Sequence, residues 1–134
     1  MRHLKKGRKL GRTKSHRLAT LKALAMALIE HEAITTTIPK AREASRYVDR
    51  LITTARGGNL AARRLVASRL GNEAMAKKLF EDVAPRYATR PGGYTRVIKL
   101  AKFRIGDASQ LARLELVEKR EKPKSEKKEK DKKK

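Results

Sequence analysis

The sequence predicts an α+β domain in which about four helices pack against a small three-stranded sheet. Two observations indicate this fold class. Apolar residues recur at three- and four-residue steps through most of residues 15–84, as they do on one face of a helix. Short β-branched or alternating runs occupy residues 33–38 and 94–117, as in half-buried strands. A length of 134 residues suits one such domain with tails.

The first half of the body predicts a helix, a strand and a second helix. Ser15 can cap a helix that runs to about residue 32, because Leu18 and Leu21 begin an apolar stripe after it. The β-branched residues 33–38 follow as a strand. Pro39 suits the first position of the next helix, since its missing N–H would be unpaired there anyway.

Two shorter helices come next. The glycine pair 57–58 stops the second helix, and Asn59 can cap a third helix over residues 60–70. Asn72 can cap a fourth helix, which the pattern ends before Pro85 because proline cannot continue a helix.

The last part of the body predicts a loop followed by a hairpin. Residues 86–93 form the loop, and residues 94–105 form a strand whose consecutive apolar residues indicate either a bulge or burial on both faces. Gly106 begins a turn, and residues 111–117 alternate cleanly between apolar and charged side chains.

Charge divides the chain into three parts: an arm at residues 1–14, the body at 15–117 and a tail at 118–134. The formal net charge is +22, and residues 1–22 contain nine basic residues and no acidic ones. The arm has too little apolar surface to offset the entropy of its own ordering, so we expect it to be extended and to fold against a partner. The tail is lysine-rich and free of apolar residues, so we expect it to be disordered.

Several classes of function are not expected. The chain has no cysteine, so a thiolate metal site and a cysteine nucleophile are not possible. It also has no glycine-rich phosphate-binding loop. Residues 30–32, Glu-His-Glu, form the one cluster of histidine and carboxylates in the sequence. Neighbouring side chains on a helix point about 100° apart, so these three are not expected to converge on one metal ion or proton. No apolar run reaches the length of a membrane span. We therefore expect no enzyme activity, cofactor, metal, small-molecule substrate or membrane partner.

Three basic segments predict binding to nucleic acid. The arm can neutralise phosphates, and Arg63 and Arg64 cluster with Arg56 and Arg69 around the third helix. Residues 85–96 alternate arginines with tyrosines, on which unstacked bases could stack; the alternative is that these rings pack in the core. The predicted contact residues are Arg2, His3, Lys5, Lys6, Arg8, Lys9, Arg12, Lys14, His16, Arg17, Arg63, Arg64, Arg86, Arg90, Tyr94 and Arg96.

Irregular folded RNA suits these segments better than DNA. DNA-binding proteins usually present a recognisable helix to the major groove or a dimeric motif, and no such element is evident here. An arm, a loop with rings and dispersed charge fit RNA that exposes single-stranded bases.

The opening "MRHLKKGRKLGRTKSHR", together with "LIEHEAITTT", "ARRLVASRL" and "KLFEDVAPRYATRPGGYTRVIKL", closely resembles the bacterial large-subunit ribosomal protein seventeen family. The match runs in order to about Val117. The resemblance implies a mixed α/β domain that binds large-subunit (23S) ribosomal RNA near the exit of the polypeptide tunnel. It also implies a role in assembly, neighbouring large-subunit ribosomal proteins as partners, a cytoplasmic location in the ribosome, and an RNA-contacting arm over residues 2–17.

Two other functions remain open at the level of sequence. A histone-like architectural DNA-binding protein would share the basic composition, although apolar wedges for kinking a duplex are expected in its loops and none is evident here. A nucleic-acid-processing enzyme would need a convergent set of acid, base or metal-binding residues.

Overall fold

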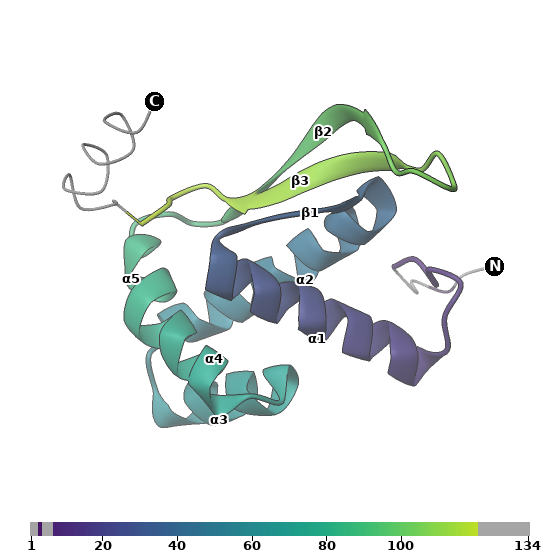
Figure 1. The fold of residues 1–134 in the computed structure, drawn as a ribbon. Coiled ribbons are helices and arrows are strands. Elements are labelled where there is room, and N and C mark those ends of the chain that lie inside the picture. The colour runs from purple at the N-terminus through teal and green to yellow at the C-terminus, as the bar shows by residue number, and fades with distance from the viewer. Residues whose placement is uncertain (1–2, 4–6, 121–134) are drawn as a thin grey trace, which may run out of the picture.

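The protein is one sheet laid over a group of helices (Figure 1). The structure is a computed structural model that describes residue 3 and residues 7–120. The helices α1, Lys14–His31, and α2, Ile38–Arg56, lie beneath the sheet, and the shorter helices form the opposite end of the molecule. The predicted α+β class is confirmed.

The short helices begin and end close to the predicted positions. Helix α3 spans Leu60–Leu70, and the side chain of Asn59 accepts a hydrogen bond from the backbone N–H of Ala62 at 2.7 Å. Gly71 ends it in the left-handed conformation, with φ of 71°. Helix α4, Glu73–Lys78, is capped in the same way by Asn72. The predicted asparagine caps and the glycine stop are therefore confirmed.

The end of the fourth predicted helix differs from expectation. After α4 the chain continues as a π-helical turn, η1, Leu79–Val83, and then as α5, Ala84–Arg86. The N–H of Ala84 donates to the carbonyl of Leu79, five residues back, which marks the widened turn. The prediction that the helix ends before Pro85 is thus wrong, because the wide turn lets the chain accept a residue without an N–H.

Two helix starts also shift by one or two residues. Thr13, not Ser15, is the N-cap of α1, and its side chain makes no capping hydrogen bond. Ile38 is already helical, so Pro39 lies in the first turn of α2 but is not its first residue.

The sheet has three antiparallel strands in the order β1-β3-β2. They are β1, Ala33–Thr37, β2, Thr95–Phe103, and β3, Gln110–Leu116. The register of β2 against β3 shifts between Lys99 and Phe103, so the predicted bulge is confirmed. The alternative, burial on both faces of β2, is not confirmed, since most residues of this strand are exposed.

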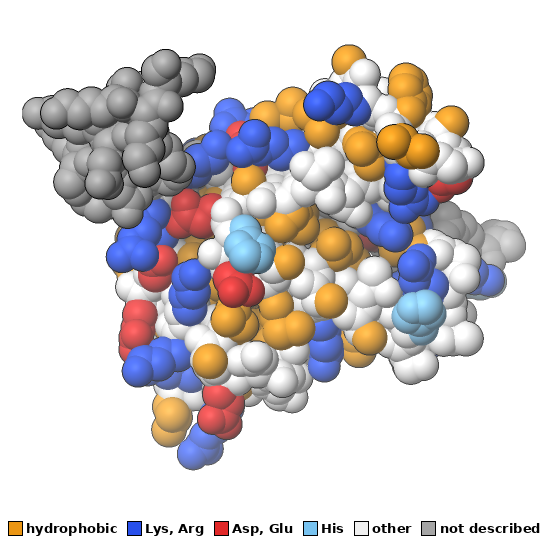
Figure 2. Space-filling view, in the orientation of Figure 1, with side chains coloured by type: hydrophobic (Ala, Val, Ile, Leu, Met, Phe, Trp, Pro, Cys, Tyr) orange, Lys and Arg blue, Asp and Glu red, His pale blue; other side chains and the backbone are white. Residues whose placement is uncertain are grey.

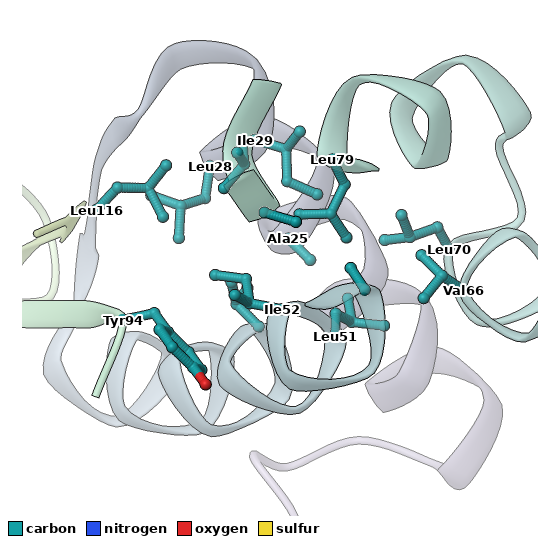
Figure 3. Packing of buried hydrophobic residues seen from close by; sticks show 14 of the residues in the cluster. Ala25, Leu28, Ile29, Leu51, Ile52, Val66, Leu70, Leu79, Tyr94 and Leu116 are labelled. Carbon is teal, nitrogen blue, oxygen red and sulfur yellow. The ribbon is translucent and has the colours of Figure 1, made fainter. Parts of the chain in front are cut away.

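The core lies between the sheet and the helices (Figure 3). Leu116 of β3 lies beside Leu28 of α1 (Figure 3), and Leu114 is buried in the same core, as the alternation in β3 predicted. A polar contact also joins the layers, because the Thr95 hydroxyl donates to the Asp49 carboxylate at 3.0 Å. Burial raises the pKa of Asp49. Among the described residues no helix is long and apolar enough to cross a membrane.

The two predicted end segments are only partly described. Residues 7–13 precede α1 and turn at Leu10 and Gly11, both with positive φ. The first three residues of the predicted tail contact the body: the N–H of Glu118 donates to the Tyr87 hydroxyl, and the N–H of Arg120 donates to Glu32. The remainder of that tail, from residue 121, lies outside the described residues.

Candidate nucleic-acid interface

The described part of the arm presents its basic side chains to solvent. His3, Arg8 and Lys9 are exposed, and Arg8 lies 3.8 Å from the carboxylate of Glu43 on α2. Arg12 is half-buried; its Nη1 donates to the Leu10 carbonyl, and its Nε has no hydrogen-bond partner among the described atoms. The predicted contacts Arg2, Lys5 and Lys6 lie outside the described residues.

The start of α1 concentrates positive charge where a helix already carries it. Lys14 and His16 are exposed and Arg17 is half-buried, all within the first turn or just after it. No acidic residue occupies that turn. The N-terminus of a helix has a partial positive charge and unpaired N–H groups, so basic side chains there are unfavourable in the free protein and favourable beside a phosphate.

Two of the predicted arginines project from α3. Arg63 and Arg64 are both exposed and have no ion pair among the described residues. The Arg63 guanidinium lies over the ring of Phe80, 5.3 Å from its centroid. Both side chains are accessible, as binding requires.

Arg86 has a structural role that the sequence did not indicate. Its guanidinium donates to the Glu32 carboxylate at 2.8 Å and to the Asp82 carboxylate at 2.6 Å, and only 15% of the side chain is exposed. These bonds tie α5 to the end of α1 and to η1. The hydrogen bond from Arg86 is the main cause that lowers the pKa of Asp82. A guanidinium held by two carboxylates offers little charge to RNA.

Arg96 is likewise paired within the protein. It lies directly opposite Glu115 in the β2–β3 register and donates to that carboxylate through Nε and Nη2. Arg113 and Lys119 reach the same carboxylate, at 3.3 Å and 2.8 Å. The pKa of Glu115 is lowered, first by the hydrogen bond from Lys119 and then by the one from Arg96.

The rings of the 85–96 segment belong to the core. Tyr94 is 1% exposed and meets Tyr87 edge to face, with 5.2 Å between ring centroids. The Tyr94 oxygen accepts from Arg56 at 2.9 Å and from Thr53 at 3.5 Å, and the Thr53 bond is the main cause that lowers the pKa of Tyr94. The prediction that the Tyr94 ring stacks on bases is therefore corrected, because a buried ring has no face to offer. Arg90 stays half-buried in the loop, donating to the Gly92 carbonyl.

The cluster of histidine and carboxylates does not converge. His31 lies 3.9 Å from the Glu30 carboxylate, whereas Glu32 turns away to Arg86. Among the described residues no group of three histidine, aspartate or glutamate side chains is placed to hold a metal ion.

Among the described residues, cations without an ion pair remain on the arm, α1 and α3, and also on α2 and β2. Figure 2 shows acidic side chains gathered over the half of this face that holds α4 and α5, and basic ones along the sheet and beside the start of α1. The sequence placed Arg56 beside the third-helix cluster but not among the contacts. The structure places Arg56 and Arg63 in the lining of one pocket, in keeping with that predicted cluster.

Known proteins similar to this chain all point to one family. The family model described as ribosomal protein L17 matches residues 20–117. The large ribosomal subunit protein bL17 of Thermus thermophilus is 55% identical over 118 residues, which cover 88% of this chain and the whole of that protein. The proteins of the same name from Novosphingobium aromaticivorans and Orientia tsutsugamushi are 56% and 51% identical, over 88% of this chain and 83% and 81% of their own lengths.

A family model that matches most of the folded body, and relatives above 50% identity over most of their own length, settle the family. The predicted resemblance is thereby confirmed, and it concerns a structural kind of protein with no enzymatic role. The chain belongs to the ribosomal protein L17 family.

Proposed function

We propose that this ribosomal protein binds large-subunit (23S) ribosomal RNA through the arm, the start of α1 and the exposed arginines of α3. We further propose that it supports assembly of the large subunit in the cytoplasm, beside other large-subunit proteins. The observation that carries the proposal is the uncapped start of α1, where basic residues take the place that acidic residues usually hold.

This arrangement is unfavourable for the protein on its own. Each misplaced charge in the first turn costs about 0.3–1 kcal/mol in a free helix at low ionic strength. Beside a phosphate backbone this unfavourable electrostatic energy becomes favourable, because the same N–H groups and cations then face an anion. Support also comes from a contrast between arginines: Arg86 is held by two carboxylates within the fold, whereas Arg63 and Arg64 are exposed and have no ion pair among the described residues.

The experiment is sedimentation of the tagged, full-length protein from a cell lysate. We expect it to travel with the large subunit at physiological salt, and to be released only when the salt concentration is high enough to weaken its many phosphate contacts. Recovery in the free fraction, or on the small subunit, would contradict the proposal.

A competition assay separates RNA from the DNA alternative, which gains no support from the family match. At matched salt, folded large-subunit RNA should displace the protein from duplex DNA far better than the reverse. Equal competition would favour a non-specific polycation and would count against the proposed function.

A further inference from the structure

A pocket opens where α2, α3 and the η1–α5 segment meet. Its volume is about 320 Å³, at the small end of the range for ligand pockets. The apolar part of its lining comes from Ala55, Phe80, Ala84 and Pro85. The pocket lining therefore combines apolar side chains with Arg56 and Arg63, the second of which is an α3 arginine that the proposed function invokes.

The Arg63 side chain covers the aromatic part of this lining. Its guanidinium sits 5.3 Å from the centroid of the Phe80 ring, at a distance typical of cation–π contact. Because Arg63 is exposed, its side chain remains accessible to a ligand from outside. Bases of RNA stack on such guanidinium planes as readily as on aromatic rings.

Arg56 supplies a second, fixed cation in the lining of the pocket. Its two Nη atoms donate to the Tyr94 hydroxyl and to the Ala88 carbonyl, each at 2.9 Å. These bonds hold the guanidinium in place and use two of its five N–H donors. No carboxylate lines the pocket among the described residues, so both arginines keep their charge available to an anion.

We propose that this pocket receives one unstacked nucleotide of RNA. The base stacks on the Arg63 guanidinium, which Phe80 supports from beneath, and the adjoining phosphate takes a hydrogen bond from Arg56. This inference rests on the proposed function, and adds to it the place and the chemistry of one contact. A planar, apolar group attached to an anion is the ligand that an apolar pocket with two arginines at its rim accommodates.

The test measures the affinity of the full-length protein for large-subunit RNA at about 0.1 M and about 0.4 M salt. Three variants are compared: Arg63→Met, Arg63→Lys and Arg64→Met. Arg64 is the matched control, because it is the next residue of α3, is also exposed, and is not part of the pocket lining. Far-ultraviolet circular dichroism verifies that each variant is folded.

If a base stacks on Arg63, substitutions of Arg63 should reduce the affinity for RNA even when the positive charge is kept. Arg63→Met should weaken binding by about tenfold at both salt concentrations, since stacking of one base contributes an effect of that order and is not screened by salt. Arg63→Lys should lose nearly as much, because lysine keeps the charge but has no plane. Arg64→Met should lose at most about threefold, and only at the lower salt concentration.

Two results would contradict nucleotide binding at the pocket while leaving the proposed function intact. One is an Arg63→Lys variant that binds like the wild type, which would reduce Arg63 to a simple phosphate contact. The other is equal, salt-sensitive losses at Arg63 and Arg64. Failure of the wild-type protein to prefer large-subunit RNA would instead contradict the proposed function itself.

Discussion

Tyr94 and Arg90 lie four residues apart in the chain but have opposite surroundings. The Tyr94 ring is enclosed by the core, and its hydroxyl accepts from Arg56 and donates to the Pro91 carbonyl at 3.3 Å. Among the described residues, the Arg90 side chain bonds only within its own loop, to the Gly92 carbonyl. Two substitutions in one segment should therefore have very different effects on stability.

Replacement of Tyr94 by alanine should lower the free energy of unfolding by about 3–5 kcal/mol, as for other large aromatic side chains in a core. Arg90→Ala is the matched control and should change it by less than about 0.5 kcal/mol. Urea denaturation monitored by circular dichroism measures both. A Tyr94→Ala protein as stable as the wild type would show that the ring is not part of the core.

The ion pairs of the arginines show what could not be predicted from the sequence one residue at a time. Arg86 and Arg96 look like the other arginines along the chain, and the fold reveals how firmly carboxylates hold them. One partner of Arg86, Asp82, lies four residues back at a helical spacing, but the other, Glu32, is 54 positions away and no local pattern links it to Arg86. The arm and α3 arginines could be identified from sequence because no acidic residue stands near them in the chain, although in the fold Arg8 lies 3.8 Å from the Glu43 carboxylate.

At the scale of elements, α1 combines a helix start with charges of the wrong sign for stability. Lys14→Glu would place a carboxylate beside the unpaired N–H groups of the first turn. We expect it to raise the free energy of unfolding by about 0.3–1 kcal/mol at low salt. The same change should weaken binding to large-subunit RNA, because a negative charge would then face the phosphates.

The opposite signs of the two effects make the α1 prediction specific. Arg50→Glu, in the middle of α2, makes the same change of charge without an interaction with a helix end, and should leave stability nearly unchanged. Thermal unfolding at low salt and RNA titration provide the two measurements. A destabilised Lys14→Glu variant would show that Lys14 supports the helix rather than a ligand.

The outer face of the sheet is organised by Glu115, which is 3% exposed and contacts three basic side chains. Its folded-state pKa lies below the ordinary 4.5, so its contribution to stability is present above that value. It disappears as the pH falls through the folded-state pKa. Glu115→Gln should therefore be less stable than the wild type by about 1–2 kcal/mol at pH 7.

The difference between Glu115→Gln and the wild type should shrink below about pH 4, as the wild-type carboxyl also becomes neutral. Unfolding measured from about pH 7 to about pH 3 tests this convergence. A constant difference across that range would mean that the side chain acts through packing and not through its charge. Asp49, whose pKa burial raises, has the reverse pH dependence and is unaffected by the substitution.

Most elements were predictable because their signals are local. Asparagine before a helix and glycine after it act within one turn, and the alternation of β3 is visible in seven residues. The π turn at Leu79–Val83 has no such signal: Pro85 marks a helix end by the usual rule, and the wide turn before it is a backbone adjustment. The Tyr94 ring was ambiguous for a similar reason, since burial of a loop residue depends on what folds beneath it.

For the whole molecule, the surplus of positive charge separates folding from binding. The net charge of +22 opposes compaction, and within the described body the carboxylates that offset it are largely engaged in holding the fold together. RNA supplies the remaining counter-charge from outside. The affinity of the protein for RNA should consequently depend steeply on salt, whereas its fold should not.

Deletion of residues 1–12 tests this separation, because it leaves Thr13 in place before α1. The deleted segment contains six basic residues and no acidic one. The slope of log affinity against log salt should decrease by up to about 4–5, if each cation meets a phosphate. Loss of the long Arg8–Glu43 pair should lower the free energy of unfolding by less than about 1 kcal/mol.

Deletion of residues 121–134 is the control, since it removes eight basic and four acidic residues from the other end. Its intermixed acidic residues repel phosphates, so the salt slope should change far less than for the arm deletion. Equal slopes for the two truncated proteins would show that the arm acts as generic positive charge. A body that unfolds without the arm would show instead that the arm contributes to the fold, and binding and folding would then not be separable.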